Sequence, residues 1–410
     1  MFIKLALKSL FHRKGSVLLS IFAISVSIFV ILGVEHIRYQ TKENFSNTVS
    51  GIDLIVGGRT SSINLLLYSV FRIGSPTNNI RWETFEKIVN NKNVKWAIPI
   101  SLGDSHKGYP VIGTTKNYFQ YFSYGKNHSL LFSKGQPFNQ TFDLVLGSDV
   151  AKKLGYKIGD KLILAHGLSK VSFSLHSDSP FTVVGVLLPT GTPIDRTLHV
   201  SLQGIEAIHL NWQDRVKNKN SSNVSKLQNY DLKPKNITAF MLGLKSKIST
   251  FKVQRDINSY LNEPISAILP GVALSELWQM MRILEDTLFF ISILVFLSVL
   301  LGLSSMMLSS IKQRSYEIQL LRIIGAPKYY LFLLIELEVF FIILISIFFG
   351  AGVISICLFL SKDYLLTSFG LQIGMNIFNQ NTLFIVFSIV ISSLIIAIVP
   401  SLSSYFEAKK

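Results

Sequence analysis

The chain has 410 residues, of which 49% are hydrophobic, and its mean hydropathy is +0.41. This length allows more than one domain, and this hydrophobicity excludes an ordinary soluble protein of the same size. The formal net charge is +16, but the basic residues flank apolar runs or are dispersed between 213 and 235, so nucleic-acid binding is not expected. The lone cysteine, Cys357, excludes an internal disulfide and any cysteine-based metal or redox motif.

The N-terminal residues predict a membrane-surface helix followed by a spanning helix. Residues 1–14 are basic and amphipathic, which predicts an elbow helix whose basic residues, Arg13 among them, face lipid headgroups. Residues 15–34 are predicted as the first transmembrane helix, because Val17–Val34 is uncharged and largely apolar. A cleaved signal peptide is the alternative, but no small-x-small cleavage site follows Val34.

Residues 35–284 have the composition of a soluble mixed α/β domain. We predict strands at Ile52–Val56, Trp96–Leu102, Pro110–Gly113, Asp143–Leu146, Lys161–Ala165, Phe181–Leu187, Thr197–Ser201, Ile237–Leu244 and Ile265–Leu269. We predict helices at Trp82–Val89, Asp149–Leu154, Gln203–Leu210 and Lys247–Leu261, and one from Leu274 that continues into the membrane. The Lys-, Asn- and Ser-rich stretch Gln213–Lys235 is expected to be a loop.

Three further runs contain no charged residue: Thr287–Ile311, Val339–Ser361 and Thr382–Phe406. A charge at mid-bilayer costs about 2.5–3.5 kcal/mol on insertion scales, so charge-free runs of this length indicate spanning helices. We predict transmembrane helices at 285–311, 330–361 and 382–406, with a short periplasmic connection at 362–381.

The distribution of basic residues sets the predicted topology. Ten of them fall on the segments assigned to the cytoplasm: Lys4, Lys8, Arg13, Lys14, Lys312, Arg314, Arg322, Lys328, Lys409 and Lys410. The short outer connection carries only Lys362, so the positive-inside rule places both termini in the cytoplasm. The predicted fold class is a membrane protein with four transmembrane α-helices and a large mixed α/β periplasmic domain inserted between helices 1 and 2.

The segment 312–329, between the second and third predicted spans, is short, basic and amphipathic. Ile318, Leu321 and Ile324 recur at helical spacing, while Gly325 is suited to ending a helix. This pattern predicts a helix on the inner membrane surface that could pass a push from a cytoplasmic partner into the membrane. A plain basic loop that only obeys topology rules is the alternative.

The residue order here resembles the signature of the FtsX/MacB-type (type VII) ABC transporter permeases. The matching residues are Arg314, Glu317, Ile318, Leu321, Arg322, Gly325 and Ala326, followed in the next span by Glu338 and Gly350. The phrases VIGTTKNYF, GQPF, DLVLGSDVAKKLGYKIGDKLIL and FTVVGVL, from Val111 to Leu187, resemble the periplasmic domain of the same family in the expected order.

The resemblance implies that 312–329 is the coupling helix that docks on the ATP-hydrolysing subunit. It also implies an FtsX-like permease domain at 285–406, a porter-like periplasmic domain with a mostly-β subdomain inserted at about 103–212, and the bacterial inner (cytoplasmic) membrane as the location. Ser346 and Ala351 stand where family members often carry glycine or another small residue.

The function implied is that of a non-catalytic permease subunit. The sequence contains no G-x-x-x-x-G-K-[ST], G-x-S-x-G or H-E-x-x-H, so ATP would be bound by a separate ABC ATPase, and this chain needs no cofactor of its own. The expected partners are that ATPase, a second permease as homodimer or heterodimer, a periplasmic adaptor or lipoprotein, and membrane lipids. Efflux from the periplasmic side by mechanotransmission is the leading hypothesis. The alternatives are an FtsX-like regulator of a periplasmic enzyme, LolC/LolE-like lipoprotein release, zinc-related transport, or a receptor without an ATPase.

Four of the eight histidines gather between 166 and 209: His166, His176, His199 and His209. Neutral imidazole is a natural zinc ligand, so these residues form a candidate metal site. No pair of them has the close spacing of a known metal motif, and ordinary surface or hydrogen-bonded histidines are the alternative interpretation.

Overall fold

The computed structural model describes residues 10–11, 13–125, 127–166, 180–217, 232–313, 323, 325, 327–369 and 374–407. The chain divides into two compact units. We call them the membrane unit, made of Met1–Thr41, Met281–Tyr364 and Ile373–Lys410, and the α/β unit, made of Lys42–Met280 and Leu365–Gln372.

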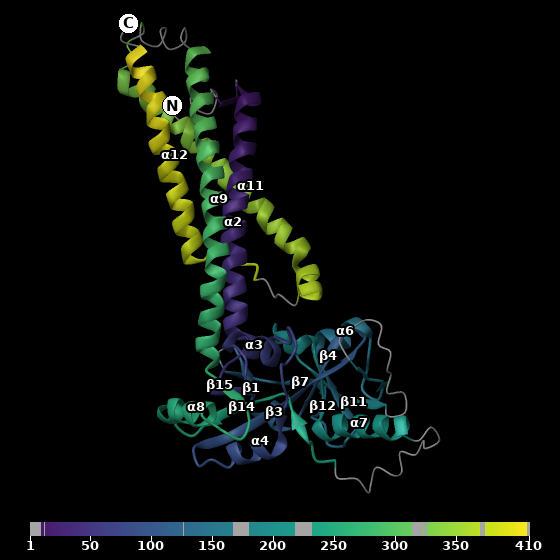
Figure 1. Cartoon of the computed structure of the whole chain (residues 1–410). Coiled ribbons are helices and arrows are strands. Elements are labelled where there is room, and N and C mark those ends of the chain that lie inside the picture. The colour runs from purple at the N-terminus through teal and green to yellow at the C-terminus, as the bar shows by residue number, and fades with distance from the viewer. Residues whose placement is uncertain are drawn as a thin grey trace. The chain divides into compact units, whose positions relative to one another are not determined.

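Four long helices are apolar and long enough to cross a membrane. They are α2 (Lys14–Asn47), α9 (Pro270–Gln313), α11 (Lys328–Phe369) and α12 (Gln380–Glu407). Each contains one of the predicted spans, and α2, α9 and α11 continue beyond the charge-free runs into polar sequence. In the membrane unit, α2 and α11 run in one direction, and α9 and α12 run in the other (Figure 1).

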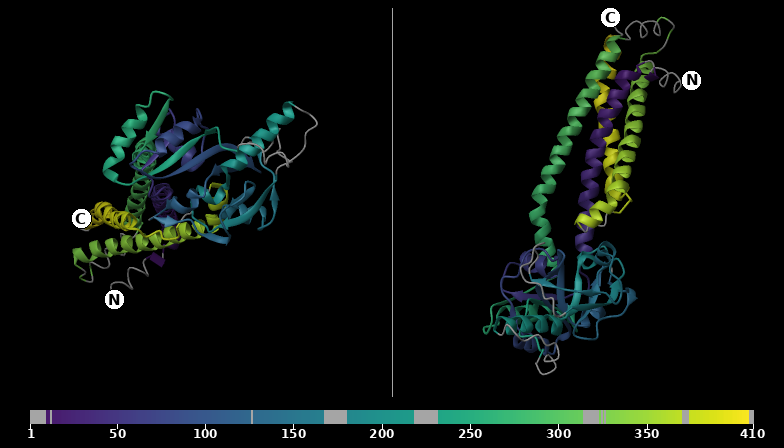
Figure 2. Two further views of the ribbon diagram at one scale, coloured as in Figure 1. Left: turned by 90° about the horizontal axis from the view of Figure 1, so that it is seen from below. Right: turned by 90° about the vertical axis from the view of Figure 1, so that its right-hand side faces the viewer.

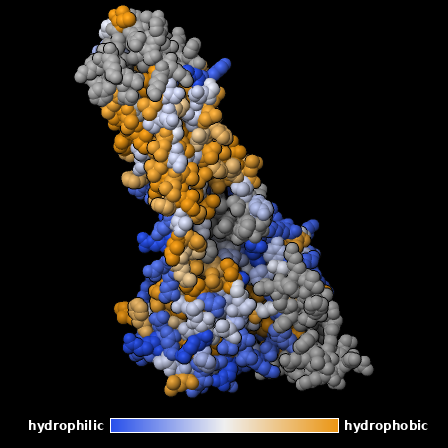
Figure 3. Space-filling view, turned by 45° about the horizontal axis from the view of Figure 1, so that its top comes forward, coloured by the Kyte–Doolittle hydropathy of each residue, from blue (hydrophilic) through white to orange (hydrophobic). Residues whose placement is uncertain are grey.

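The outer surface of these helices is hydrophobic, as a lipid-facing surface requires. On α9, Leu288, Phe290 and Leu301 are at least half exposed. Figure 3 shows the hydrophobic residues forming a continuous band over the helices.

The α/β unit is built on an eleven-stranded sheet with the main order β15-β1-β14-β3-β4-β12-β8-β11-β7. These strands are β1 (Leu54–Gly58), β3 (Val94–His106), β4 (Tyr109–Thr114), β7 (Phe132–Gly135), β8 (Asp143–Leu146), β11 (Phe181–Leu187), β12 (Leu198–Ser201), β14 (Ala239–Leu244) and β15 (Ile265–Ile268). Two short strands extend it: β9 (Lys161–Leu162) pairs with β11, and β10 (Ala165–His166) pairs with β3. The short strands β2 (Ile80–Arg81) and β13 (Asn236–Ile237) form one separate pair, and β5 (Ser123–Tyr124) and β6 (His128–Ser129) form another.

Strand β3 joins the two halves of this sheet. Its first half pairs with β14, from Ala97 opposite Leu242 to Ile100 opposite Ala239, and its second half pairs with β4. The register shifts between Leu102 and Ser105, where Gly103 has φ of +142°, a value that residues with a side chain rarely adopt. The predicted start of the inserted subdomain, at about residue 103, therefore falls within a continuous strand.

The helices of the α/β unit pack against this sheet. They are α3 (Ser62–Leu66), a π-helical turn (Leu67–Phe71), α4 (Trp82–Val89), α5 (Asn117–Tyr121), α6 (Ser148–Leu154), α7 (Leu202–Lys217) and α8 (Thr250–Asn258), with short 3-10 turns at Pro193–Arg196 and Lys247–Ser249. Helix α8 packs on β15, and α7 packs on β4 and β12 (Figures 1 and 2).

Two local predictions are wrong. The helix expected to end at Leu210 continues to Lys217, because Ile205, Ile208, Trp212 and Val216 extend the apolar helical spacing into the stretch predicted as a loop. The strand predicted over Lys161–Ala165 is divided between β9 and β10, which pair with different neighbours.

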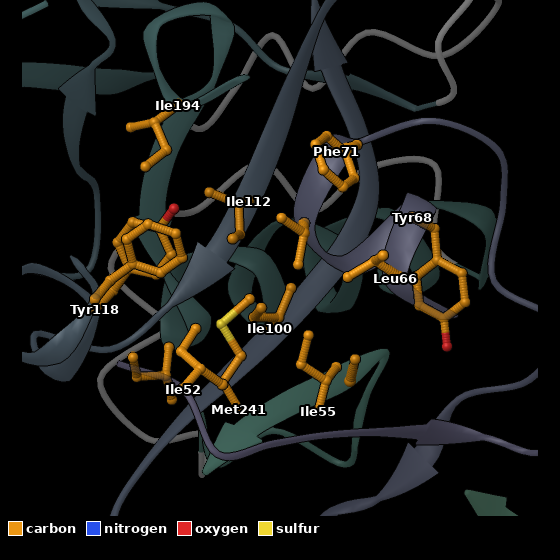
Figure 4. Close-up of a cluster of buried hydrophobic side chains, with 14 of the residues drawn as sticks. Ile52, Ile55, Leu66, Tyr68, Phe71, Ile100, Ile112, Tyr118, Ile194 and Met241 are labelled. Carbon is orange, nitrogen blue, oxygen red and sulfur yellow. The ribbon is translucent and has the colours of Figure 1, made fainter. Parts of the chain in front are cut away.

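Alternation along the strands creates a core on each face of the sheet. On β14, Phe240 and Leu242 point into a cluster shared with α4 and α8, whereas Met241 belongs to a second cluster with Leu66 and Tyr68. Figure 4 shows this second cluster. Side chains on both faces are fully buried, and each buried Leu, Ile or Phe contributes about 1.5–3 kcal/mol relative to exposure.

Candidate functional site: the packing of two membrane helices

A buried ion pair joins the beginning of α2 to α11. Arg13, which directly precedes α2, donates a hydrogen bond from Nη2 to Oε2 of Glu338 over 2.9 Å. The Glu338 side chain is 1% exposed and the Arg13 side chain is 16% exposed. A buried carboxylate needs a charged or hydrogen-bonding partner, and the guanidinium supplies one. The expectation that Arg13 faces lipid headgroups is therefore wrong, because its side chain pairs with Glu338.

Small residues bring the same two helices close together along their length. Ser346 is fully buried, and its Oγ lies 3.3 Å from the carbonyl oxygen of Ile21 and donates over 2.7 Å to that of Ile342. A Cβ added at Gly350 would lie 2.9 Å from a methyl carbon of Ile28, closer than real side chains approach. Small residues let helix backbones approach in a membrane, so Ser346 and Gly350 set the separation of the pair.

The contacts follow a constant register. Arg13 pairs with Glu338 and Ile21 with Ser346, and both pairs are separated by 325 positions in the sequence. A constant offset means that the two helices run in the same direction and stay in contact over at least two turns. Figure 1 shows the same common direction, with α11 inclined to α2.

The other end of α2 is held by polar side chains. A ring nitrogen of the buried His36 lies 3.0 Å from the carbonyl oxygen of Gly374, and the backbone N–H of Gly374 donates to Oε1 of Gln40 over 3.2 Å. Gly374 lies in the connection between α11 and α12. Arg38 pairs with Glu35 at 2.9 Å and reaches Glu285 of α9 at 3.9 Å. This end of α2 is therefore attached to α9 and to the connection between α11 and α12.

Most of the predicted coupling helix lies outside the described residues. This applies to Arg314, Glu317, Ile318, Leu321, Arg322 and Ala326. Gly325 has φ of +98°, the left-handed conformation that its predicted role requires. Ile323, which lies between Arg322 and Gly325 in the sequence, is 83% exposed. Helix α11 begins immediately after Pro327.

Two family models match the chain. The MacB-like periplasmic core domain matches residues 17–260, and the FtsX-like permease C-terminal domain matches residues 289–409. The chain belongs to the MacB/FtsX-like, type VII family of ABC transporter permeases. Glu338 and Gly350 of this permease therefore lie in its FtsX-like domain. Arg13, the partner of Glu338, lies just before the match to the MacB-like domain, and Ile28, which contacts Gly350, lies within that match.

Two solved structures are similar to part of this permease. The periplasmic region of MacB from Actinobacillus actinomycetemcomitans shares 9% identity with a TM-score of 0.35, covering 56% of this chain and 94% of that one. The extracellular domain of the noncanonic ABC-type transporter YknZ from Gram-positive bacteria shares 12% identity with a TM-score of 0.29, covering 53% of this chain and 98% of that one. No curated protein sequence matches.

Of the four histidines of the predicted metal site, the structure describes the side chains of His199 and His209. His199 is fully buried, with ring centroids 5.1 Å from Tyr118 and 5.8 Å from Phe119. Burial lowers the pKa of His199 to about 3, so its imidazole is neutral at physiological pH. His176 lies outside the described residues.

Asp104 lies near the side chain of His209 and is paired with His166 through the backbone. Nε2 of His209 is 3.7 Å from Oδ2 of the buried Asp104, and His166 is the backbone partner of Asp104 in the pairing of β10 with β3. Among the described residues no three His, Cys, Asp or Glu side chains meet closely enough to hold a metal ion. Metal binding by His166, His176, His199 and His209 stays a prediction that a zinc-binding measurement would test.

Proposed function

We propose that this permease couples ATP hydrolysis by a separate ABC ATPase to a conformational change of its periplasmic α/β unit, and so expels substrate from the periplasmic side. Two copies would pair about a two-fold axis, each docking one ATPase subunit on the segment between α9 and α11. The sequence carries no phosphate-binding loop, which is consistent with ATP binding by a partner.

The observation that supports this proposal is the connection between the helices and the sheet. Helix α2 leads by a short linker into β1, and α9 begins at Pro270, directly after β15 and Leu269. Strands β1 and β15 are hydrogen-bonded neighbours, with Ile55 opposite Ile268. A displacement of α2 relative to α9 would therefore act on two adjacent strands of the same sheet.

The α2–α11 contact supplies the other part of the route. The segment 314–326 precedes α11 in the chain. Helix α11 is held against α2 and the residue before it by the ion pair and by the close packing at Gly350, and the bonds to Gly374 hold α2 to the connection that follows α11. A push on the cytoplasmic end of α11 would move α2 with it, because packed interfaces shift as bodies rather than deform.

The test is a mild-detergent purification of the tagged chain, with co-purifying proteins identified by mass spectrometry and ATP hydrolysis assayed. We expect a stoichiometric ATPase that is lost in Leu321→Asp. Ile248→Asp is the matched control, because Ile248 is a 92% exposed aliphatic residue of the α/β unit and its substitution should leave the ATPase bound. An equal yield of ATPase with wild type and Leu321→Asp would contradict the docking assignment.

The same experiment separates the alternative functions. A co-purifying periplasmic hydrolase would favour an FtsX-like regulator, and accumulation of lipoproteins in the inner membrane on depletion would favour lipoprotein release. Expulsion of a substrate that depends on ATP would favour efflux.

A further inference from the structure

Three polar side chains meet within an apolar core of the α/β unit. Arg72 follows the π-helical turn Leu67–Phe71, Tyr118 lies on α5, and His199 lies on β12. Tyr118 and His199 are fully buried, and the Arg72 guanidinium is in polar contact with the Tyr118 hydroxyl and close enough to affect His199 electrostatically. We call these three residues the Arg72 cluster. Figure 4 shows Tyr118 among the hydrophobic side chains of this core.

The backbone holds Arg72 in an uncommon conformation. Its φ and ψ of 60° and 30° lie in the left-handed region, which residues with a side chain adopt infrequently. Its Nη1 donates to the carbonyl oxygen of Ser69 in the preceding turn. Such outliers persist where the surrounding structure fixes them and are frequent at ligand-binding positions.

The cluster holds buried polar atoms that have no hydrogen-bond partner among the described residues. Nε of Arg72, Oη of Tyr118 and both ring nitrogens of His199 are buried, and none makes a hydrogen bond of ordinary geometry with the residues that the structure describes. The contacts of Tyr118 with Arg72 and of His199 with the Val145 backbone fall outside that geometry. Buried polar groups normally have partners. The donors among these atoms are the N–H of Arg72 Nε, the hydroxyl of Tyr118 and the single N–H of the neutral His199 imidazole, and together they point to an additional acceptor.

The charge of the cluster is also uncompensated. Within the described part of the chain, no carboxylate pairs with the Arg72 guanidinium; its interactions are those with Ser69 and Tyr118. His199 is neutral, and the neighbouring Phe71 and Phe119 are apolar and buried. Arg72 is partly buried and its Nε is fully buried. A cation in such surroundings is more stable when a negative charge or several acceptors lie beside it.

We propose that the Arg72 cluster binds a small, weakly hydrated monovalent anion such as chloride. One negative charge neutralises the guanidinium and accepts hydrogen bonds from Arg72, Tyr118 and the N–H of His199. A divalent oxyanion would leave a net negative charge among aromatic side chains, and a strongly hydrated ion such as fluoride would lose more hydration on entry.

The test compares the thermal unfolding of the full chain in detergent in sodium gluconate, chloride, bromide and fluoride at equal ionic strength. A ligand that binds only the folded state raises its melting temperature, by about 3–5 °C when the anion is at about ten times its dissociation constant. We expect chloride and bromide, but not fluoride, to stabilise the wild type relative to gluconate.

Variants separate this site from general salt effects. Arg72→Met should abolish the difference between anions, Tyr118→Phe should reduce it, and Arg255→Met, at an exposed arginine of α8, should retain it. If Arg72→Met does not fold, Tyr118→Phe and the anomalous signal of bromide in crystals of the full chain decide instead. The proposal would be overturned by equal anion dependence in all variants, by no anion dependence in the wild type, or by the absence of bromide beside Arg72. An internal water would then be the partner of the donors.

Discussion

Removing either member of the Arg13–Glu338 pair should destabilise the membrane unit strongly, whereas removing both should not. At 2.9 Å, two unit charges attract by about 6 kcal/mol at an effective dielectric constant of 20. Desolvation of the two ions offsets most of this gain, so the net contribution of such a pair relative to apolar side chains is near zero. A single substitution instead leaves one buried charge alone, which costs about 3–5 kcal/mol.

We therefore expect Arg13→Met and Glu338→Met each to lower the free energy of unfolding by about 3 kcal/mol. This value is at the lower end of the range for a broken buried pair, because the Arg13 side chain retains 16% exposure. The double variant should lie within about 1 kcal/mol of the wild type. Thermal unfolding of the purified chain in detergent measures these differences, and each single variant should melt about 6–12 °C lower.

The pair Arg282 and Asp286 provides a matched control. These residues lie 3.7 Å apart on α9 and are 75% and 71% exposed. The same methionine cycle there should give a coupling of at most about 0.5 kcal/mol, because exposed pairs contribute little. Additive effects of Arg13→Met and Glu338→Met, with no recovery in the double variant, would refute the reasoning.

Three further predictions test neighbouring features. Gly350→Leu should separate α2 from α11 and lower the free energy of unfolding by about 1–3 kcal/mol, as measured by thermal unfolding. Gly352→Leu is the control and should be tolerated, because an added Cβ there meets nothing within 4 Å. Equal effects of the two substitutions would contradict close packing at Gly350. Gln40→Leu removes the acceptor of a backbone N–H and should cost about 1 kcal/mol in the same assay, and an unchanged melting temperature would count against that bond. Burial depresses the pKa of His199 from 6.5 to about 3, so between these pH values the folded state binds fewer protons than the unfolded state. The neutral imidazole therefore favours the folded state fully above pH 6.5, and this contribution is lost as the pH falls from about 6.5 to about 3. His199→Phe should remove up to about 1.4 kcal/mol per pH unit of that dependence, while the exposed His128→Phe should leave it intact; a variant with the wild-type slope would exclude a neutral buried His199.

The spanning helices and several elements of the α/β unit were predictable because local patterns determine them. The charge-free runs located all four long helices, since the bilayer penalises charge independently of the neighbouring helix. Helix Trp82–Val89 has the predicted bounds, with Phe85 and Ile88 on its buried side. The family followed from the order of residues between Arg314 and Gly350, which the match to the FtsX-like permease domain confirms at the level of the family.

The contacts between distant segments were not predictable from one sequence. Arg13 and Glu338 are 325 positions apart, and a basic residue before a span is satisfied equally by headgroups or by a buried acid. His199 was grouped with its neighbours in sequence, but β12 lies between β4 and β8 with its residues buried on both faces, so its imidazole enters the core. Knowledge of the sheet order would have been needed to recognise this.

The central claim is that a push from the ATPase reaches the α/β unit through α2 and α11. The most direct measurement places spin labels on the α/β unit of the full chain, in complex with its ATPase, and records their separation with and without ATP. We predict a change that depends on ATP in the wild type and in Gly352→Leu, and its loss in Gly350→Leu although ATP is still hydrolysed. A separation that never responds to ATP, or a response that survives Gly350→Leu unchanged, would contradict the account.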